Sequence, residues 1–282
     1  MSEALGLPDD DLRFVAETAG ERCDPDEAPA LLRGRDGLLD VMLEDDRLVE
    51  RVLGDERALL RVSPRLVFSV LLRRVVRDLN GRPYTMERGT GETVAVFDAP
   101  RVRRFVAEPE IWTYLVSMLT SFVRNESVTV LVRRREHYVR RRFNTSNLED
   151  MIALAGLVEA GEVPWIFRRI ADIALFQSGM FPRSLGGGAG RAARAHAVTP
   201  TLATYEEHGR RFYRLAASRA AEGTPPAGFN YMVAGRVSAG GAESRVLTAL
   251  ADEFAAARKS LELLSDRYLR WSAVRWFPGF EG

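Results

Sequence analysis

Cysteine and histidine are scarce in this chain of 282 residues, and each scarcity excludes a kind of chemistry. The single cysteine, Cys23, cannot form an intrachain disulfide, and one cysteine is typical of a reducing compartment. The three histidines lie in no HExxH or ExxH pattern, so the usual helical metal-ligand pairs are missing. We therefore predict no metal site and no cofactor.

Long apolar runs are also missing. The longest uncharged and largely apolar stretch, 111–123, has 13 residues, whereas a helix needs about 20 to span a bilayer. The acidic start of the chain lacks the basic and apolar regions of a signal peptide. These absences predict a soluble, cytoplasmic protein that has no membrane partner.

Known catalytic motifs do not occur. There is no GxSxG nucleophile elbow, and the glycine-rich run at 186–190 lacks the Lys-Ser/Thr that completes a phosphate-binding P-loop. The simpler interpretation of that glycine-rich run is a flexible linker without a binding function. We assign no catalytic residue, and the sequence favours a protein that is not an enzyme.

Charge is balanced overall but not along the chain. The net charge is +1, yet residues 1–60 hold 17 acidic residues against 7 arginines, so the basic excess lies further along. Lys259 is the one lysine among the basic residues. Such asymmetry predicts either a basic surface for a partner or an internal docking of opposite charges.

Helical periodicity and turn residues predict the fold class. Ser63 before Pro64 is a typical helix start, and 242–270 has the pattern of one long helix. Two runs of β-prone residues flanking turns predict hairpins near 84–98 and 127–144. The expected protein is mainly α, a multi-helix array with one or two small β-hairpins. We expect a helical region at 1–185 and another at 196–282, which pack as one unit.

The most unusual local feature is the basic segment 133–142, in which Tyr138 stands among arginines. Interleaved aromatic and guanidinium groups suit phosphate contacts and stacking. The segment is either a solvated hairpin, docked on the acidic first 60 residues, or a surface for an anionic partner. Its candidate binding residues are Arg133, Arg134, Arg135, Arg140, Arg141 and Arg142.

A second feature points to nucleic acid. Helices over 38–60, a helix over 63–79 and a hairpin over 84–97 follow the order of a winged helix, whose last helix enters the major groove. The arginines that could form the outer face of that helix are Arg65, Arg73, Arg74 and Arg77. The same order of elements is common in proteins that do not bind DNA.

Two stretches, 172–182 (DIALFQSGMFP) and 205–216 (YEEHGRRFYRLA), resemble a group of uncharacterised bacterial helical proteins with an "SGFFP" segment and a downstream "Y…G…Y..LA" helix. Met180 stands where that group has an aromatic residue. The resemblance implies a shared fold element and no chemistry.

Polar residues of these two stretches form a second candidate site. Asp172 lies in an apolar helical stretch, where a carboxylate requires partners, and Tyr205 or Tyr213 is the expected one. The group serves as a structural network or as part of a ligand pocket between helices. Its members are Asp172, Gln177, Ser178, Tyr205, His208 and Tyr213.

The leading interpretation is a non-enzymatic helical binding or interaction protein. The alternative is a nucleic-acid-binding protein that uses 63–97 and 133–142. A second alternative is an enzyme with an unrecognised pocket between helices.

Overall fold

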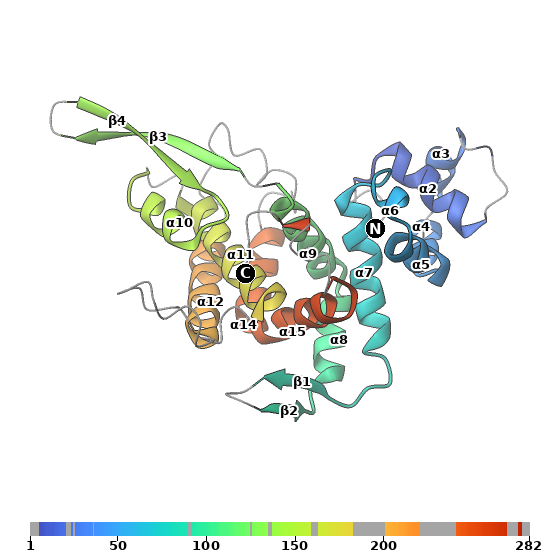
Figure 1. Cartoon of the computed structure of the whole chain (residues 1–282). Coiled ribbons are helices and arrows are strands. Elements are labelled where there is room, and N and C mark those ends of the chain that lie inside the picture. Colours follow the sequence, from blue (N-terminus) through green and yellow to red (C-terminus); the bar gives the residue numbers. More distant parts are fainter. Residues whose placement is uncertain are drawn as a thin grey trace. The chain divides into compact units, whose positions relative to one another are not determined.

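The computed structural model describes residues 6–20, 24, 26–35, 37–88, 92–124, 126–134, 137–158, 163–182, 201–219, 241–269 and 276–277. Over these residues it has 13 α-helices and two two-stranded antiparallel sheets, which confirms the predicted fold class (Figure 1). The chain divides into unit 1 (1–84 and 97–120) and unit 2 (85–96 and 121–282). The boundary expected between 185 and 196 lies outside the described residues, so that division stays a prediction.

Unit 1 is built from short helices gathered around one apolar helix. That helix, α7 (Pro64–Asp78), begins where Ser63 accepts a hydrogen bond from the Leu66 backbone N–H, as the Ser-Pro pattern predicts. The other helices of unit 1 are α2 (Asp9–Ala19), α3 (Ala28–Gly34), α4 (Leu38–Leu43), α5 (Asp46–Gly54), α6 (Glu56–Leu59), α8 (Ala99–Ala107) and α9 (Pro109–Phe122), whose last turn reaches unit 2.

A buried carboxylate ties the start of unit 1 to α7. Asp11 accepts hydrogen bonds from the Ser63 backbone N–H, at 2.7 Å, and from the Ser63 hydroxyl. Burial raises the pKa of the Asp11 carboxyl above its ordinary value, and the two bonds from Ser63 oppose that rise. The serine therefore caps α7 and anchors α2 at the same point.

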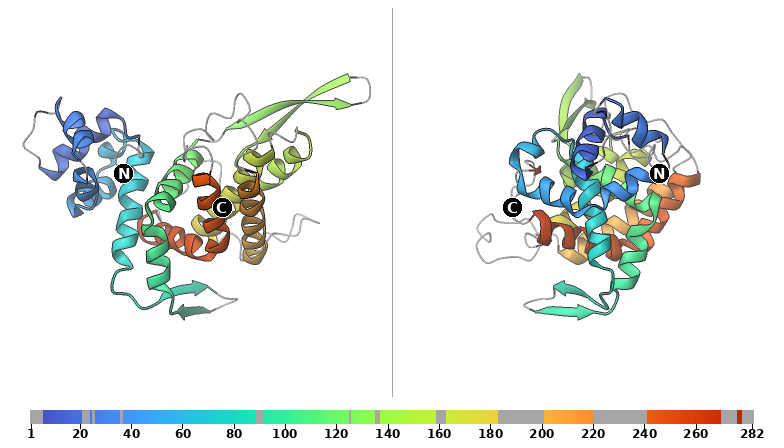
Figure 2. Two further views of the ribbon diagram at one scale, coloured as in Figure 1. Left: turned by 180° about the vertical axis from the view of Figure 1, so that it is seen from behind. Right: turned by 90° about the vertical axis from the view of Figure 1, so that its right-hand side faces the viewer.

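Unit 2 holds both hairpins and the longest helices. The hairpins are β1 (Thr85–Arg88) with β2 (Thr93–Val96), and β3 (Ser127–Arg134) with β4 (His137–Asn144). The helices are α10 (Leu148–Ala155), α11 (Val163–Met180), α12 (Leu202–Ser218), α14 (Gly241–Asp252), α15 (Phe254–Leu264) and the π-helix η2 (Ser265–Leu269). Figure 2 shows β3 and β4 extending as a narrow ribbon away from α10 and α11.

The prediction of one helix over 242–270 is wrong. The helix breaks at Glu253, whose φ of −103° and ψ of 29° are not helical, and the chain resumes as α15. After the break, Phe254 packs on Gly209 of α12, and Leu261 packs on Gly179 of α11. Close packing against two glycines thus outweighs the continuous apolar periodicity of the sequence.

None of the described helices is both long and apolar enough to cross a membrane.

Candidate functional site

The β3–β4 ribbon, here called the arm, has two different faces. Residues paired directly across an antiparallel ladder share a face, and neighbours along a strand alternate between faces. Val130 pairs with Arg141, and Val128 pairs with Phe143, so one face is largely apolar. Leu131 pairs with Arg140, and Arg142 pairs with Thr129, so the other face carries two of the arginines. The same register places Tyr138 on this second face, here called the basic face.

The base of the arm is fixed to the helices of unit 2. Arg169 of α11 donates a 2.8 Å hydrogen bond to the Thr145 carbonyl and stacks 3.8 Å above the ring centre of Phe122. Asp150 of α10 accepts from the Asn144 backbone N–H at 2.8 Å. Phe143 is fully buried. A rigid support of this kind holds a projecting ribbon in one direction.

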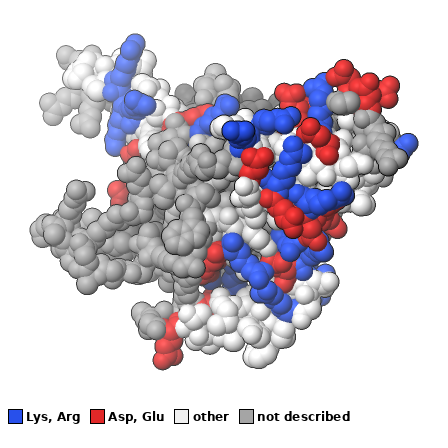
Figure 3. Space-filling model, turned by 45° about the vertical axis from the view of Figure 1, so that its right-hand side comes forward, with Lys and Arg blue, Asp and Glu red and all other residues white. Residues whose placement is uncertain are grey.

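Beyond this base, the arginines of β4 lie in solvent. Arg140, Arg141 and Arg142 are all exposed. Arg142 donates to the Ser127 hydroxyl at 2.6 Å, and Arg141 lies 4.8 Å above the ring of Phe143. Over the part of the chain that the structure describes, none of the three pairs with a carboxylate. In Figure 3 the arm, at upper left, carries Lys/Arg atoms along its length.

The predicted hairpin is present, although some of its residues lie outside the description. The strands match the expected range 127–144. The turn at Arg135 and Glu136 lies outside the described residues, as do the side chains of Arg133 and Arg134. The candidate site on the arm therefore depends on Arg140, Arg141 and Arg142, three of the six arginines predicted for it. The side chains of the other three lie outside the described residues.

The acidic N-terminal residues meet arginines of their own unit. Arg73 of α7 pairs with Asp40, and both Arg74 and Arg77 pair with Asp46. Figure 3 shows acidic and basic atoms alternating over unit 1. Three of the four arginines expected on the outer face of a winged-helix recognition helix are thus held in ion pairs. This occupation weakens the case for 63–97 as a nucleic-acid surface.

The second candidate site is a buried polar network in unit 2. The Tyr213 hydroxyl donates a 2.8 Å hydrogen bond to Asp172, and both side chains are buried. Arg168 lies 3.9 Å from the second oxygen of Asp172 and 2.8 Å from Glu243 of α14. Three helices are therefore joined through two carboxylates, one guanidinium and one phenol.

The remaining four residues predicted with Asp172 and Tyr213 do not join this network. Ser178 donates to the carbonyls of its own helix, and His208 bonds to the Thr204 carbonyl at 2.7 Å. The side-chain amide oxygen of Gln177 is buried without a hydrogen-bond partner among the described residues. Burial and the nearby Glu149 charge raise the pKa of Tyr205. A ligand-binding role for the six residues stays a prediction.

Removing the Tyr213 hydroxyl is expected to destabilise unit 2. Tyr213→Phe leaves the ring in place and deprives buried Asp172 of a donor, which costs about 1–3 kcal/mol. Tyr205→Phe is the matched control on the same helix. The Tyr205 hydroxyl makes no hydrogen bond to any described residue, so its loss is expected to cost under about 0.5 kcal/mol. Urea unfolding of both variants measures the difference, and equal midpoints would contradict a structural role for the Tyr213 bond.

Sequence reasoning missed a larger buried ion cluster. The Arg258 side chain of α15 is 1% exposed and bonds to Glu87, Glu206 and Glu262 at 2.7, 2.8 and 2.9 Å. Lys259 adds a fourth ion pair, 3.5 Å from Glu87. Only the i, i+4 spacing of Arg258 and Glu262 was visible in the sequence, because the other two partners are 171 and 52 residues away.

Comparison with known protein families, curated proteins and solved structures finds no match to this chain.

Proposed function

We propose that this chain binds duplex DNA and that the arm is the contact surface. The observation that carries the proposal is the exposed basic face of the arm, whose base is held by Arg169. On this face neither Arg140 nor Arg142 pairs with a carboxylate of any described residue. Side chains of this kind, on a rigid projecting ribbon, are placed to reach phosphates. The proposal narrows the leading interpretation of a binding protein to one class of partner.

The dimensions of the arm suit a DNA groove. Each strand has 8 residues, which at ~3.3 Å per residue gives a ribbon of roughly 26 Å. The major groove of B-DNA is about 12 Å wide and admits a two-stranded β-ribbon. The major groove of double-stranded RNA is too deep and narrow for side chains to read. The ribbon therefore favours DNA over duplex RNA.

Two exposed apolar side chains also favour a partner on the basic face. Leu131 is 61% exposed and Tyr138 is 66% exposed, and the register puts both beside Arg140. Large apolar groups left in water lose the free energy that burial supplies. In a groove, a phenol ring stacks or contacts sugars, and an aliphatic side chain contacts the thymine methyl group.

The charge of unit 1 supports an external partner rather than an internal one. The acidic residues Asp40 and Asp46 are already paired with arginines of α7. A docking of the arm on the acidic first 60 residues would have to compete with these pairs. Phosphates supply the anionic partner without that competition.

Arginines on opposite faces of β4 provide the test. Arg140→Ala and Arg142→Ala are each expected to weaken duplex binding for every sequence alike, because phosphate contacts carry no base information. Each variant is also expected to lower the slope of log affinity against log salt by about 0.9. Fluorescence anisotropy with a labelled duplex at several salt concentrations measures both quantities.

Arg141→Ala is the matched control, since Arg141 is also exposed but shares the apolar face with Phe143. It is expected to leave the salt slope unchanged. Equal losses in Arg140→Ala and Arg141→Ala would contradict the assignment of the face. No duplex binding by the unmodified chain at low salt, or stronger binding to single-stranded RNA than to duplex DNA, would contradict the proposed function.

A further inference from the structure

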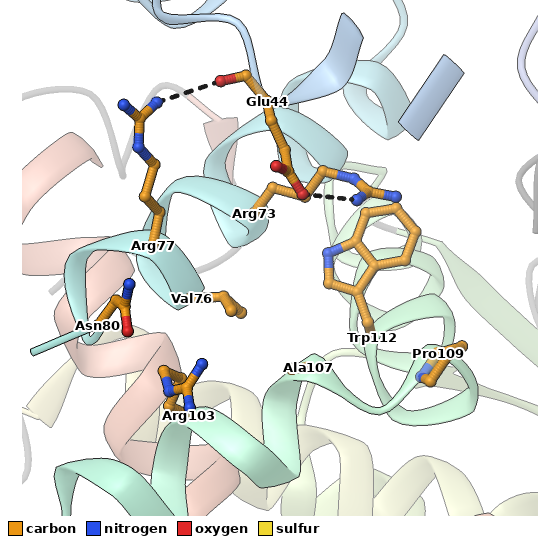
Figure 4. Close-up of a pocket in the computed structure, with 9 residues that line it drawn as sticks. All are labelled: Glu44, Arg73, Val76, Arg77, Asn80, Arg103, Ala107, Pro109 and Trp112. Atoms are coloured by element: carbon orange, nitrogen blue, oxygen red, sulfur yellow. Dashed lines mark hydrogen bonds and ion pairs between the residues drawn. The ribbon is translucent and has the colours of Figure 1, made fainter. Parts of the chain in front are cut away.

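Unit 1 contains a cavity of about 280 Å³ between α7, α8 and the start of α9. Figure 4 shows three arginines around it: Arg73 and Arg77 from α7, and Arg103 from α8. Two further polar residues line the cavity: Asn80, just after α7, and Trp112 of α9. Among the lining residues, Glu44 is the one with a carboxylate. The lining is therefore rich in hydrogen-bond donors and carries more positive than negative charge.

Trp112 presents an unused donor to this cavity. The residue is 4% exposed, and its indole nitrogen is buried without a hydrogen-bond partner in the described chain. Figure 4 shows the nitrogen edge of the ring turned toward the space between Val76 and Arg103. An indole N–H can only donate, and a buried donor that makes no hydrogen bond costs about 1–3 kcal/mol of stability. The cavity thus supplies a donor for which the described residues supply no acceptor.

The three arginines are not equivalent. Arg73 pairs with Asp40 and Glu44 and stacks 4.5 Å above Trp112, which fixes one wall. Arg77 pairs with Asp46 and donates to the Glu44 carbonyl, as the dashed line in Figure 4 marks.

Arg103 is half-buried and has neither a hydrogen bond nor an ion pair to any residue that the structure describes. Among the three arginines of the cavity, Arg103 is thus the one that pairs with no carboxylate of the described residues.

We propose that this cavity binds a small phosphorylated ligand, with the phosphate held by Arg103 and the Trp112 N–H. A guanidinium matches the paired oxygens of a phosphate, and its charge strengthens each hydrogen bond. The side-chain amide of Asn80, which also lines the cavity, offers a further donor for the remaining oxygens. A volume of about 280 Å³ equals that of roughly nine water molecules, which leaves room for a short organic group beyond the phosphate.

Neighbouring arginines of α8 give the experiment a matched pair. Arg104 is exposed and does not line the cavity, whereas Arg103 does. We expect glycerol 3-phosphate to raise the melting midpoint of the unmodified chain and of Arg104→Ala in a saturable way. Arg103→Ala is expected to lose at least tenfold in apparent affinity. Trp112→Phe, which keeps the stacked ring and removes the donor, is expected to lose several-fold.

Two further probes fix the class of ligand. Inorganic phosphate is expected to bind more weakly than glycerol 3-phosphate, and acetate at equal ionic strength is expected to give no saturable rise. Phosphate also stabilises proteins without a site, through exclusion from their surface, and this effect would be the same in Arg103→Ala and Arg104→Ala. Equal responses of those two variants, no response of the unmodified chain, or equal binding of acetate would each overturn the proposal.

Discussion

Replacing Arg258 with alanine is expected to cost unit 2 about 3–5 kcal/mol, because it removes the one cation that three carboxylates share. The loss of stability arises from the carboxylates, which would remain in place without the guanidinium that they pair with. Glu262 is 8% exposed in its side chain and would remain buried without its charge-assisted bond. Guanidinium chloride unfolding followed by circular dichroism measures the loss, which is a large part of the stability of an ordinary domain.

An exposed arginine of the same unit provides the control. Arg214 pairs with Asp252 at 3.2 Å, with both side chains 60% exposed, so Arg214→Ala is expected to cost under about 1 kcal/mol. Arg258→Ala combined with Glu262→Ala should regain part of the loss, since the buried carboxylate is then absent. Additive costs in the double variant, or a loss in Arg258→Ala no greater than in Arg214→Ala, would contradict the cluster as a structural centre.

Local signals in the sequence predicted the elements well where a few neighbouring residues decide them. Ser63 caps α7, as the Ser-Pro pattern predicts. The β-branched run at 127–132 forms β3. Each of these features depends on residues within one or two turns of the chain.

Features that depend on distant partners were not predictable in the same way. The Arg258 cluster joins β1, α12 and α15, and the lone carboxylate Asp172 meets Tyr213 41 residues later. Asp172 could be suspected, because a charge in an apolar helix demands a partner. The sequence did not indicate a special role for Arg258 or for Trp112. A tryptophan on an apolar helix is ordinarily a core residue.

The glycines of the stretches 172–182 and 205–216 have a physical explanation in the packing. Tyr205, Gly209 and Tyr213 recur every four residues on the buried side of α12. Gly209 lies directly under the ring of Phe254, and Gly179 lies under Leu261. Glycine at both positions lets α15 approach α11 and α12 more closely than any other residue would allow.

Gly209→Ala is therefore expected to destabilise the chain by about 3 kcal/mol, at the upper end for overpacking. An added methyl group would meet three ring atoms of Phe254, a side chain that is fully buried and packs against Tyr213. The sign of the change in unfolding free energy is diagnostic, because replacing glycine with alanine in a helix interior ordinarily stabilises the helix by about 1 kcal/mol. Thermal and chemical unfolding of the variant measure the change.

Gly156 supplies the matched control and Phe254 supplies the rescue. Gly156 ends α10 in a right-handed helical conformation, and an added methyl group there would make only ordinary contact, so Gly156→Ala should be neutral or slightly stabilising. Phe254→Leu opens space over Gly209 and costs stability by itself. Combined with Gly209→Ala, it should cost less than the sum of the two single changes, because the leucine no longer fills the site of the clash. A stabilised Gly209→Ala, or strict additivity in the pair, would show that α12 and α15 do not meet at this glycine.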